Sequence, residues 1–244
     1  RLGTRGSQLA LWQAHAVAAR LLEIAGRRCR IIVISTSGDR LQEAPLSEVG
    51  GKRLFVKEIE DALLRDEIDL AVHSSKDMPA VLPDGLTVGA VLPREDPLDA
   101  IVLPKTVRLK PDTTYDRGAH ADVFGDRTGQ ADVVSGFSRT VGADSMSFND
   151  VVGALGESPS IGTGSVRRVA QLTRLFPRAR FTPIRGNLDT RLRKLDSGEY
   201  DAIVLAAAGL RRLGMAARIS ARVPSSVCVP APGQGIVAIE VRQN

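Results

Sequence analysis

The sequence predicts an α/β protein of two lobes, built from mixed sheets with flanking helices and joined by two hinge crossings. Short apolar runs of strand length alternate with segments of helical periodicity along most of the chain, a pattern typical of sheets that are parallel in large part. Two proline-rich stretches, residues 93–97 and 224–232, interrupt this alternation. Only one apolar run follows the second stretch. Because a lone strand cannot form a domain, we expect it to return to the first sheet, so that the chain crosses twice and leaves a cleft between the lobes.

The first domain is expected to comprise residues 1–92, with residues 230–244 returning to it. The chain begins inside a strand, and Ser7 then caps a helix that ends at Gly26. The apolar spacing that follows predicts a strand at 30–35, a helix around 55–63 and further strands at 68–72, 86–91 and 236–240.

The second domain is expected to comprise residues 98–224. Apolar spacing predicts, in order, a helix at 165–176, a strand at 180–184, a helix at 188–195 and a strand at 202–206. The residues from about 106 to 145 break the alternation, because they are rich in turn-forming residues and poor in periodic apolar ones. We expect a surface insertion there, and the functional alternative is an active-site lid.

Composition narrows the function classes. The 244-residue chain has 43% hydrophobic and 25% charged residues, as globular proteins do, and a net charge of +5. Only 4% of its residues are aromatic, too few for base-stacking surfaces, so nucleic acid is not an expected partner. It shows neither an apolar run of membrane-spanning length nor a signal peptide, so we expect a cytoplasmic protein without a membrane partner. Cys29 and Cys228 lie far apart and outside any C-x-x-C pair, which argues against a disulfide framework and a metal site.

The most informative stretch is His-Ser-Ser-Lys-Asp-Met-Pro at residues 73–79. It follows the strand expected at 68–72, and Pro79 prevents that strand from continuing, so Lys76 and Asp77 come just past a strand's carboxyl end. Ligands bind at such ends in open α/β sheets. Lys76 offers an anchor for an anion and Asp77 a carboxylate that can handle a proton. Taken alone, the stretch also fits an exposed surface ion pair.

Three further segments place arginines where a strand leads into a helix. Arg5 lies in the first, Arg167 and Arg168 in the second, and Arg185 and Arg191 in the third. The free N–H groups of a helix start attract anions, and a guanidinium group binds a carboxylate with two parallel hydrogen bonds. If the segments converge with the lysine of the 73–79 stretch, they form a site for a ligand with several carboxylates. Each taken alone also fits a capped helix with solvated arginines.

Six motifs together resemble the porphobilinogen deaminase family, also called the hydroxymethylbilane synthases. They occur in family order over nearly the whole chain outside the expected insertion, at residues 4–13, 49–58, 73–79, 94–97, 185–187 and 230–235. The resemblance implies a transferase of tetrapyrrole biosynthesis, including that of heme, which condenses porphobilinogen stepwise to hydroxymethylbilane and releases ammonia. It further implies a monomer of three domains, the first two resembling type II periplasmic binding proteins, with porphobilinogen and linear oligopyrroles as partners.

The resemblance also implies residue roles. Asp77 becomes the catalytic carboxylate, which assists loss of the protonated amine and stabilises cationic pyrrole intermediates. The family carries a dipyrromethane cofactor, held by a thioether to a cysteine, and each of its pyrroles bears an acetate and a propionate. The positions that match cofactor-binding ones are Arg5, Ser7, Lys52, Ser74, Lys76, Thr163, Ser165, Arg167, Arg168, Arg185, Arg191, Arg212 and Gln234.

The chain departs from the family pattern at several points. Gly164 stands where serine is usual, and Glu48 stands where lysine is common. The family's cofactor cysteine lies in a Gly-Gly-Cys loop of the third domain, and the sequence stops at Asn244 before such a loop, so we expect this chain alone to be inactive. The alternative function is that of a two-lobed binding protein for small polycarboxylate anions, which would need neither Asp77 nor a covalent cofactor.

Overall fold

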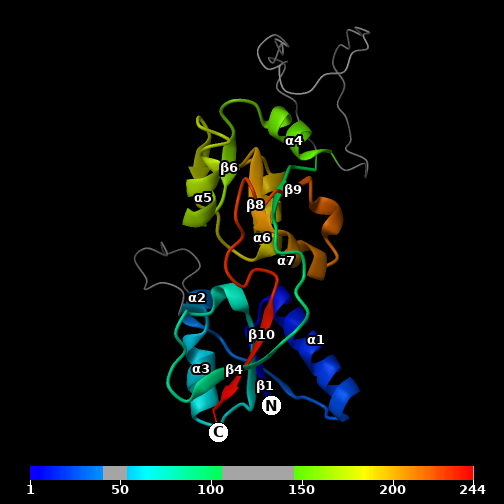
Figure 1. Cartoon of the computed structure of the whole chain (residues 1–244), viewed down its shortest axis with the longest axis vertical. Helices are drawn as coiled ribbons and strands as arrows, with labels where there is room; N and C mark the ends of the chain where they lie inside the picture. Colours follow the sequence, from blue (N-terminus) through cyan, green and yellow to red (C-terminus); the bar gives the residue numbers. More distant parts are fainter. Residues whose placement is uncertain (41–53, 106–145, 244) are drawn as a thin grey trace.

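The computed structural model describes residues 1–40, 54–105 and 146–243. They form two lobes, one above the other in Figure 1, each built on a five-stranded mixed sheet with flanking helices. The predicted α/β class is confirmed. The insertion expected at about 106–145 lies outside the described residues, as does Lys52.

The lower lobe has a sheet of order β2-β1-β3-β10-β4. β1 (Leu2–Thr4) is parallel to both β2 (Ile31–Val33) and β3 (Leu70–Ser74). β10 (Val237–Arg242), from the end of the chain, is antiparallel to β3 and to β4 (Leu86–Val91). The strand from the carboxyl end therefore lies beside the strand that leads into the 73–79 motif.

In the lower lobe a long helix lies on one side of the sheet and a shorter one on the opposite side, with another short helix toward the upper lobe (Figure 1). They are α1 (Gln8–Ala25), α2 (Ser37–Arg40), α3 (Lys57–Leu64) and the 3₁₀ turn η2 (Ser75–Asp77). No helix in the described ranges is long and apolar enough to cross a membrane.

The upper lobe repeats this plan, with a sheet of order β7-β6-β8-β5-β9. Its strands are β5 (Asp99–Val102), β6 (Ser160–Gly162), β7 (Arg180–Thr182), β8 (Ala202–Ala206) and β9 (Ala221–Val223). The three strands β7, β6 and β8 are parallel, and β5 is antiparallel to β8 and β9. Its helices are α4 (Phe148–Leu155), α5 (Val166–Leu172), α6 (Leu188–Asp196), α7 (Ala207–Arg212) and the 3₁₀ turn η3 (Ala216–Arg218).

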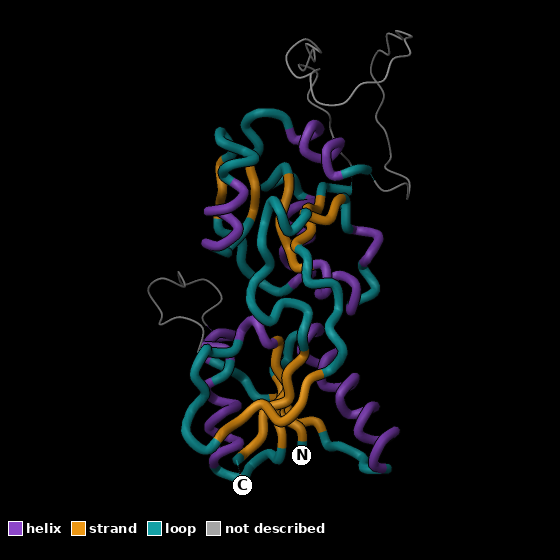
Figure 2. The backbone as a smooth tube through the Cα atoms, viewed as in Figure 1, coloured by secondary structure: helices purple, strands orange, loops and turns teal. Residues whose placement is uncertain are grey.

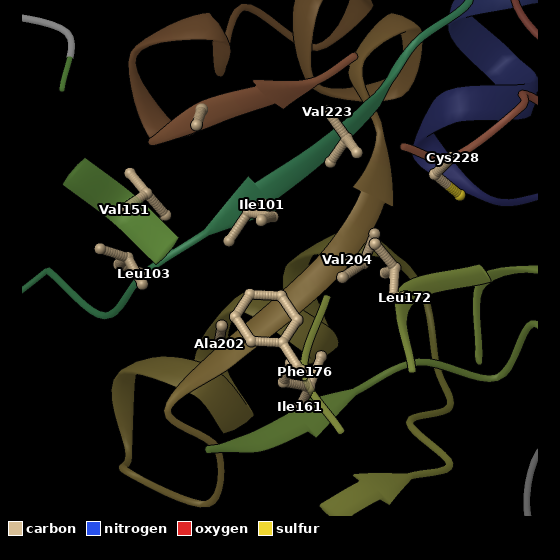
Figure 3. Close-up of a cluster of buried hydrophobic side chains, with 11 residues drawn as sticks. Ile101, Leu103, Val151, Ile161, Leu172, Phe176, Ala202, Val204, Val223 and Cys228 are labelled. Atoms are coloured by element: carbon tan, nitrogen blue, oxygen red, sulfur yellow. The ribbon is translucent and has the colours of Figure 1, made fainter. Parts of the chain in front are cut away.

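Each lobe has its own apolar core. In the upper lobe, Ile101 of β5 and Val204 of β8 pack with Leu172 of α5 and Phe176 just after it (Figure 3). In the lower lobe, Ile59 and its neighbours from α3 pack on one side of the sheet, and α1 contributes to a second cluster. Burial of such clusters is the main favourable term in folding, so each sheet is a rigid base for the loops that leave it.

Two segments cross between the lobes side by side (Figure 2). The backbone N–H of Glu95 in the first crossing donates to the carbonyl of Gly235 in the second, at 3.0 Å. The Nε of Arg94 donates to the carbonyl of Gln234 at 2.9 Å, and the side chain of Gln234 donates to the carbonyl of Pro97 at 2.6 Å. The two crossings therefore form one hydrogen-bonded ribbon.

Candidate functional site

The 73–79 motif forms the end of β3 and the tight turn η2. The backbone N–H of Ser75 donates to the carbonyl of Ile236 at 3.0 Å, and that of Met78 closes the turn on the carbonyl of Ser75 at 3.2 Å. Met78 is buried, which anchors the far side of the turn. The backbone between these anchors is fixed, and it carries Lys76 and Asp77, both part-buried, at the end of the sheet.

Glycine is required where the second crossing passes over this turn. Gly233 has a φ of 70°, and a Cβ built on it would lie 2.4 Å from the Ser75 Oγ. That separation is far below van der Waals contact, so a side chain would push the crossing away from η2.

Charged side chains from both lobes shift the pKa of Lys76 and of Arg191. Burial lowers the pKa of the Lys76 ammonium, Asp77 opposes this effect, and the charges of Arg168 and Arg191 lower the pKa further. The pKa of the Arg191 guanidinium is lowered by burial and by Arg168, while Asp77 raises it and Arg185 lowers it. We call these five residues, Lys76 and Asp77 of the lower lobe with Arg168, Arg185 and Arg191 of the upper, the interlobe site.

Three cations of the interlobe site keep donors available for a ligand. Within the described ranges, Lys76 and Arg185 have no hydrogen-bond or ion-pair partner. Arg191 donates its Nε to the carbonyl of Gly186 at 2.8 Å, and its two Nη groups have no partner among those same residues. Asp77 is the carboxylate among them. The arrangement suits an anionic ligand on which positive charge develops during reaction.

Arg168 is engaged differently from these three cations. Its guanidinium donates to Asp99 through Nε at 3.0 Å and Nη2 at 2.8 Å, and to the carbonyl of Val204 through Nη1 at 2.8 Å. The neighbouring Arg167 donates its Nη2 to the other oxygen of Asp99 at 2.7 Å and its Nη1 to the carbonyl of Val229. Both arginines are thus directed toward one buried carboxylate.

Thr163 and Ser165 serve the local backbone. Ser165 is the N-cap of α5, and its Oγ accepts from the backbone N–H of Arg168 at 3.5 Å. The Oγ1 of Thr163 accepts from the backbone N–H of Ser165 at 3.3 Å. The two side chains therefore fix the start of the helix that carries the paired arginines.

The lower lobe holds a pocket next to the interlobe site. It is lined by Arg5, Ser7, Leu9, Ala10, Gln13, Phe55, Val56, Val72, His73, Ser74 and Asp77. Arg5 is paired with Asp39, with its Nε 3.1 Å from Oδ1, and its guanidinium lies 4.3 Å from the centre of the Phe55 ring.

Two hydroxyl groups of the pocket are already hydrogen-bonded. Ser7 is the N-cap of α1, and its Oγ accepts from the backbone N–H of Ala10 at 3.3 Å. The Oγ of Ser74 accepts from Gln13 at 2.8 Å. A hydroxyl that accepts in this way still has its own proton to donate to a ligand oxygen.

Arg212 and Gln234 bind the crossings. The Nη2 of Arg212 donates to the carbonyl of Gly235 at 2.6 Å, and its guanidinium lies 5.6 Å from the Trp12 ring centre. Gln234 is buried, and its Nε2 donates to Asp99 at 2.9 Å. In this structure both residues hold the two lobes together.

Sequence reasoning missed two buried acidic residues, Asp99 and Glu240. Asp99 opens β5, and the Oε2 of Glu240 in β10 lies 3.0 Å from the Nε2 of His73 in β3. A charged residue inside an apolar run is the signal that could have indicated them, since buried charges are kept only when they are paired. No cluster of three potential metal ligands occurs among the described residues.

Comparison with known proteins gives a consistent family match along the chain. The model described as "Porphobilinogen deaminase, dipyromethane cofactor binding domain" matches residues 1–123 and 112–244. The porphobilinogen deaminase of Acidithiobacillus ferrooxidans is 43% identical over 245 residues, covering 100% of this chain and 66% of the relative. That of Synechococcus elongatus is 42% identical, covering 99% and 63%, and the chloroplastic one of Euglena gracilis is 40% identical, covering 100% and 44%. The chain thus spans about two thirds or less of the length of these relatives.

Similar solved structures include two ligand-binding proteins. The BenM effector binding domain with benzoate has a TM-score of 0.48 at 13% identity, with 100% of this chain and 83% of that chain covered. An ancestral cationic amino acid solute binding protein has a TM-score of 0.44 at 13% identity, with 100% and 82% covered.

Proposed function

Because the chain belongs to the porphobilinogen deaminase family, we propose that it contributes the reacting site of an enzyme that condenses porphobilinogen stepwise to hydroxymethylbilane. The reaction belongs to tetrapyrrole biosynthesis and releases ammonia at each step. The observation that carries the proposal is the position of Asp77, which lies with Lys76 in the turn after β3 and lines the pocket of the lower lobe. A monomeric state and a cytoplasmic location, which the resemblance implies, belong to the same proposal.

The cations of the interlobe site are suited to bind the substrate. Each pyrrole carries an acetate and a propionate, and Lys76, Arg185 and Arg191 have donors that face no partner among the described residues. Hydrogen bonds from such groups to carboxylates are shorter and stronger than those between neutral groups. Binding both carboxylates of a ring would hold the ring in one orientation, which lowers the entropy cost of the condensation.

Asp77 is suited to the chemical step. When the aminomethyl group of porphobilinogen leaves as ammonia, positive charge develops on the pyrrole, and an ionised carboxylate close by stabilises that charge. The same carboxylate can hold a proton on its way to or from the amine.

The family's dipyrromethane cofactor fits the site by charge. It bears acetates and propionates, and Lys76, Arg185 and Arg191, with Ser74 of the pocket, would hold them. When bound, it supplies the pyrrole end to which the next unit is joined. Neither cysteine is suited to carry it: Cys228 is fully buried against Arg167 and Asp99, and Cys29 packs against the apolar cluster beside α1.

Titration of porphobilinogen into the 244-residue chain by calorimetry tests the proposal. We expect binding that Lys76→Met weakens by about 1.5–3 kcal/mol, the range for hydrogen bonds to charged groups. Lys57→Met is the matched control, since Lys57 is exposed and pairs with Asp61 on the surface of α3. A chain that binds no porphobilinogen, or a Lys57 variant as weak as the Lys76 variant, would contradict the proposal.

A further inference from the structure

Asp99 lies at the centre of the junction between the lobes. It opens β5 directly after the first crossing, and none of its surface is exposed. Its Oδ1 accepts from Arg168 Nε at 3.0 Å, from Arg168 Nη2 at 2.8 Å and from Gln234 Nε2 at 2.9 Å. Its Oδ2 accepts from Arg167 Nη2 at 2.7 Å and from the thiol of Cys228 at 3.4 Å. All the donors come from α5 or from the second crossing.

This network joins three parts of the chain through one carboxylate. The arginines belong to α5 of the upper lobe, whereas Gln234 and Cys228 belong to the crossing that returns to the lower lobe. Gln234 also donates to the carbonyl of Pro97 in the first crossing. The guanidinium groups are therefore fixed relative to both crossings as well as to their own helix.

The charges of the network make it stable. Burial by itself raises the pKa of Asp99, but Arg168, Gln234 and Arg167 outweigh burial, and the pKa ends below its usual range. Two guanidinium groups against one carboxylate leave an excess of one positive charge. The excess positive charge affects the interlobe site, since the charge of Arg168 lowers the pKa of both Lys76 and Arg191.

The exposure of the arginines shows how they act. The side chain of Arg168 is 8% exposed and its three donor groups are all occupied, so it acts on the interlobe site through its charge. The side chain of Arg167 is 23% exposed, and its Nε has no partner among the described residues. If Asp99 did not hold them, both flexible side chains could turn toward any anion that entered.

We propose that Asp99 is a positioning residue: by anchoring Arg167 and Arg168 to the junction of the two crossings, it makes the interlobe site select ligands by the placement of their carboxylates rather than by charge alone. This inference rests on the proposed function for the identity of the ligand. When Asp99 holds both arginines, the carboxylates of a ligand can be bound only by the available donors of Lys76, Arg185 and Arg191, which favours the ligand whose carboxylates match those donors. Arginines that are free to move would accept many dianions about equally.

The test compares the wild-type chain with Asp99→Asn and with a matched control, Asp196→Asn. Asp196 accepts from both Nη groups of Arg218, at 3.0 and 2.7 Å, in the same lobe, and neither residue contributes to the interlobe site. Two quantities are measured in each chain. The first is the ratio of the dissociation constants for succinate and porphobilinogen, each of which carries two carboxylates, so that the general effect of a changed protein charge on carboxylate binding largely cancels. The second is the solvent exchange rate of the Arg168 Nε–H by NMR, which needs no ligand.

In Asp99→Asn we expect the ratio to fall about tenfold, since the released arginines can then turn toward any dicarboxylate that enters. The exchange of the Arg168 Nε–H should become at least about tenfold faster, and Asp196→Asn should change neither quantity by more than about twofold. An Asp99→Asn chain with an unchanged ratio and unchanged exchange overturns the inference. So does a control that changes both quantities as much.

Two further outcomes are decisive. If Asp99→Asn does not fold, Arg168→Lys replaces it, with Arg218→Lys as its control. Lysine keeps the positive charge but cannot donate to Asp99 and to the Val204 carbonyl together. The same fall in the ratio of dissociation constants is expected, and its absence overturns the inference. If the wild-type chain binds porphobilinogen no better than succinate, the proposed function fails. The exchange rate then still decides whether Asp99 anchors the arginines, so the two failures are distinguishable.

Discussion

At the scale of single residues, the cations around Asp77 divide into two groups. Lys76, Arg185 and Arg191 keep free donors, whereas Arg168 donates to Asp99 and to a backbone carbonyl. The first group is available to a ligand. Arg168, the second group, stabilises the fold and affects the interlobe site through its charge. The same substitution should therefore have different consequences in the two groups.

Replacement of one arginine from each group measures this difference. Arg185→Leu should weaken porphobilinogen binding by about 1.5–3 kcal/mol and leave the free energy of unfolding nearly unchanged. Arg168→Leu should lower the free energy of unfolding by about 3–5 kcal/mol, because it leaves the buried Asp99 carboxylate without its main partner. Calorimetry and urea unfolding give the two quantities. The division is wrong if Arg185→Leu unfolds the chain as readily as Arg168→Leu does.

The ionisation of Lys76 predicts how anion binding depends on pH. Burial lowers its pKa below the ordinary value of 10.5, and the charge of Asp77 opposes that shift. Only the protonated ammonium attracts a carboxylate, so the affinity for succinate should decrease as pH rises through the lowered pKa, that is, at a pH below the ordinary value of 10.5. Asp77→Asn removes the charge that raises the pKa, so its decrease should begin at a lower pH. An unchanged profile, or one displaced to higher pH, would show that Lys76 does not control binding.

The presence of these cations could be predicted from the sequence, but their pairing could not. The helix starts identified Arg5, Arg167, Arg168, Arg185 and Arg191 as candidates. The partners that engage the first three come from distant segments: Asp39 lies 34 positions from Arg5, and Asp99 lies 68 positions from Arg167. No local pattern contains that information, because the pairing arises only when the lobes fold.

At the scale of elements, the ribbon of two crossings depends on one glycine. Gly235 has a φ of 87°, and a Cβ built on it would lie 2.3 Å from the carbonyl oxygen of Glu95. This contact is with backbone, which cannot move aside as a flexible side chain can. The close approach lets the Glu95 N–H reach the Gly235 carbonyl and keeps the crossings together.

Substitution of this glycine measures the contribution of the ribbon. Gly235→Ala should lower the free energy of unfolding by about 1–2 kcal/mol for the left-handed backbone and by about 1–3 kcal/mol more for the clash. Gly26→Ala is the control, since Gly26 has a φ of 63° but no atom within 4 Å of a built Cβ. Urea unfolding gives both values. Equal losses in the two variants would mean that the ribbon is loosely packed.

The sequence located the long apolar elements well and the short ones poorly. The strands at 86–91 and 202–206 were predicted at their observed bounds. The helix predicted at 165–176 ends earlier, at Leu172. A tight turn follows it, in which the Leu175 N–H donates to the Leu172 carbonyl. The strands β5, β6 and β9 have only three or four residues each, too few to show periodicity. Helix α4 has a capping box of Ser147 and Asp150, which was a usable signal.

At the scale of the whole molecule, the lower sheet is completed by a strand that follows the second crossing. β10 reaches the lower sheet only after the chain has built the upper lobe, and it lies between β3 and β4. The strand that ends in the Lys76–Asp77 turn is therefore held by the last strand of the chain. Asp77 and the arginines of the upper lobe therefore depend on the same pair of crossings for their relative positions.

The activity of Asp77 in a completed enzyme is the most direct test of the central claim. A chimera would join this chain to the remaining third of the Acidithiobacillus ferrooxidans relative, of which it covers 66%. Porphobilinogen consumption is then compared among the parent chimera, Asp77→Asn and the control Asp61→Asn, whose carboxylate pairs with Lys57 on the surface. We predict that Asp77→Asn lowers the turnover rate by about 10²–10³-fold while Asp61→Asn does not, since removal of one group that stabilises developing charge costs about that much. An Asp77→Asn chimera that consumes porphobilinogen at the parent rate would contradict the account.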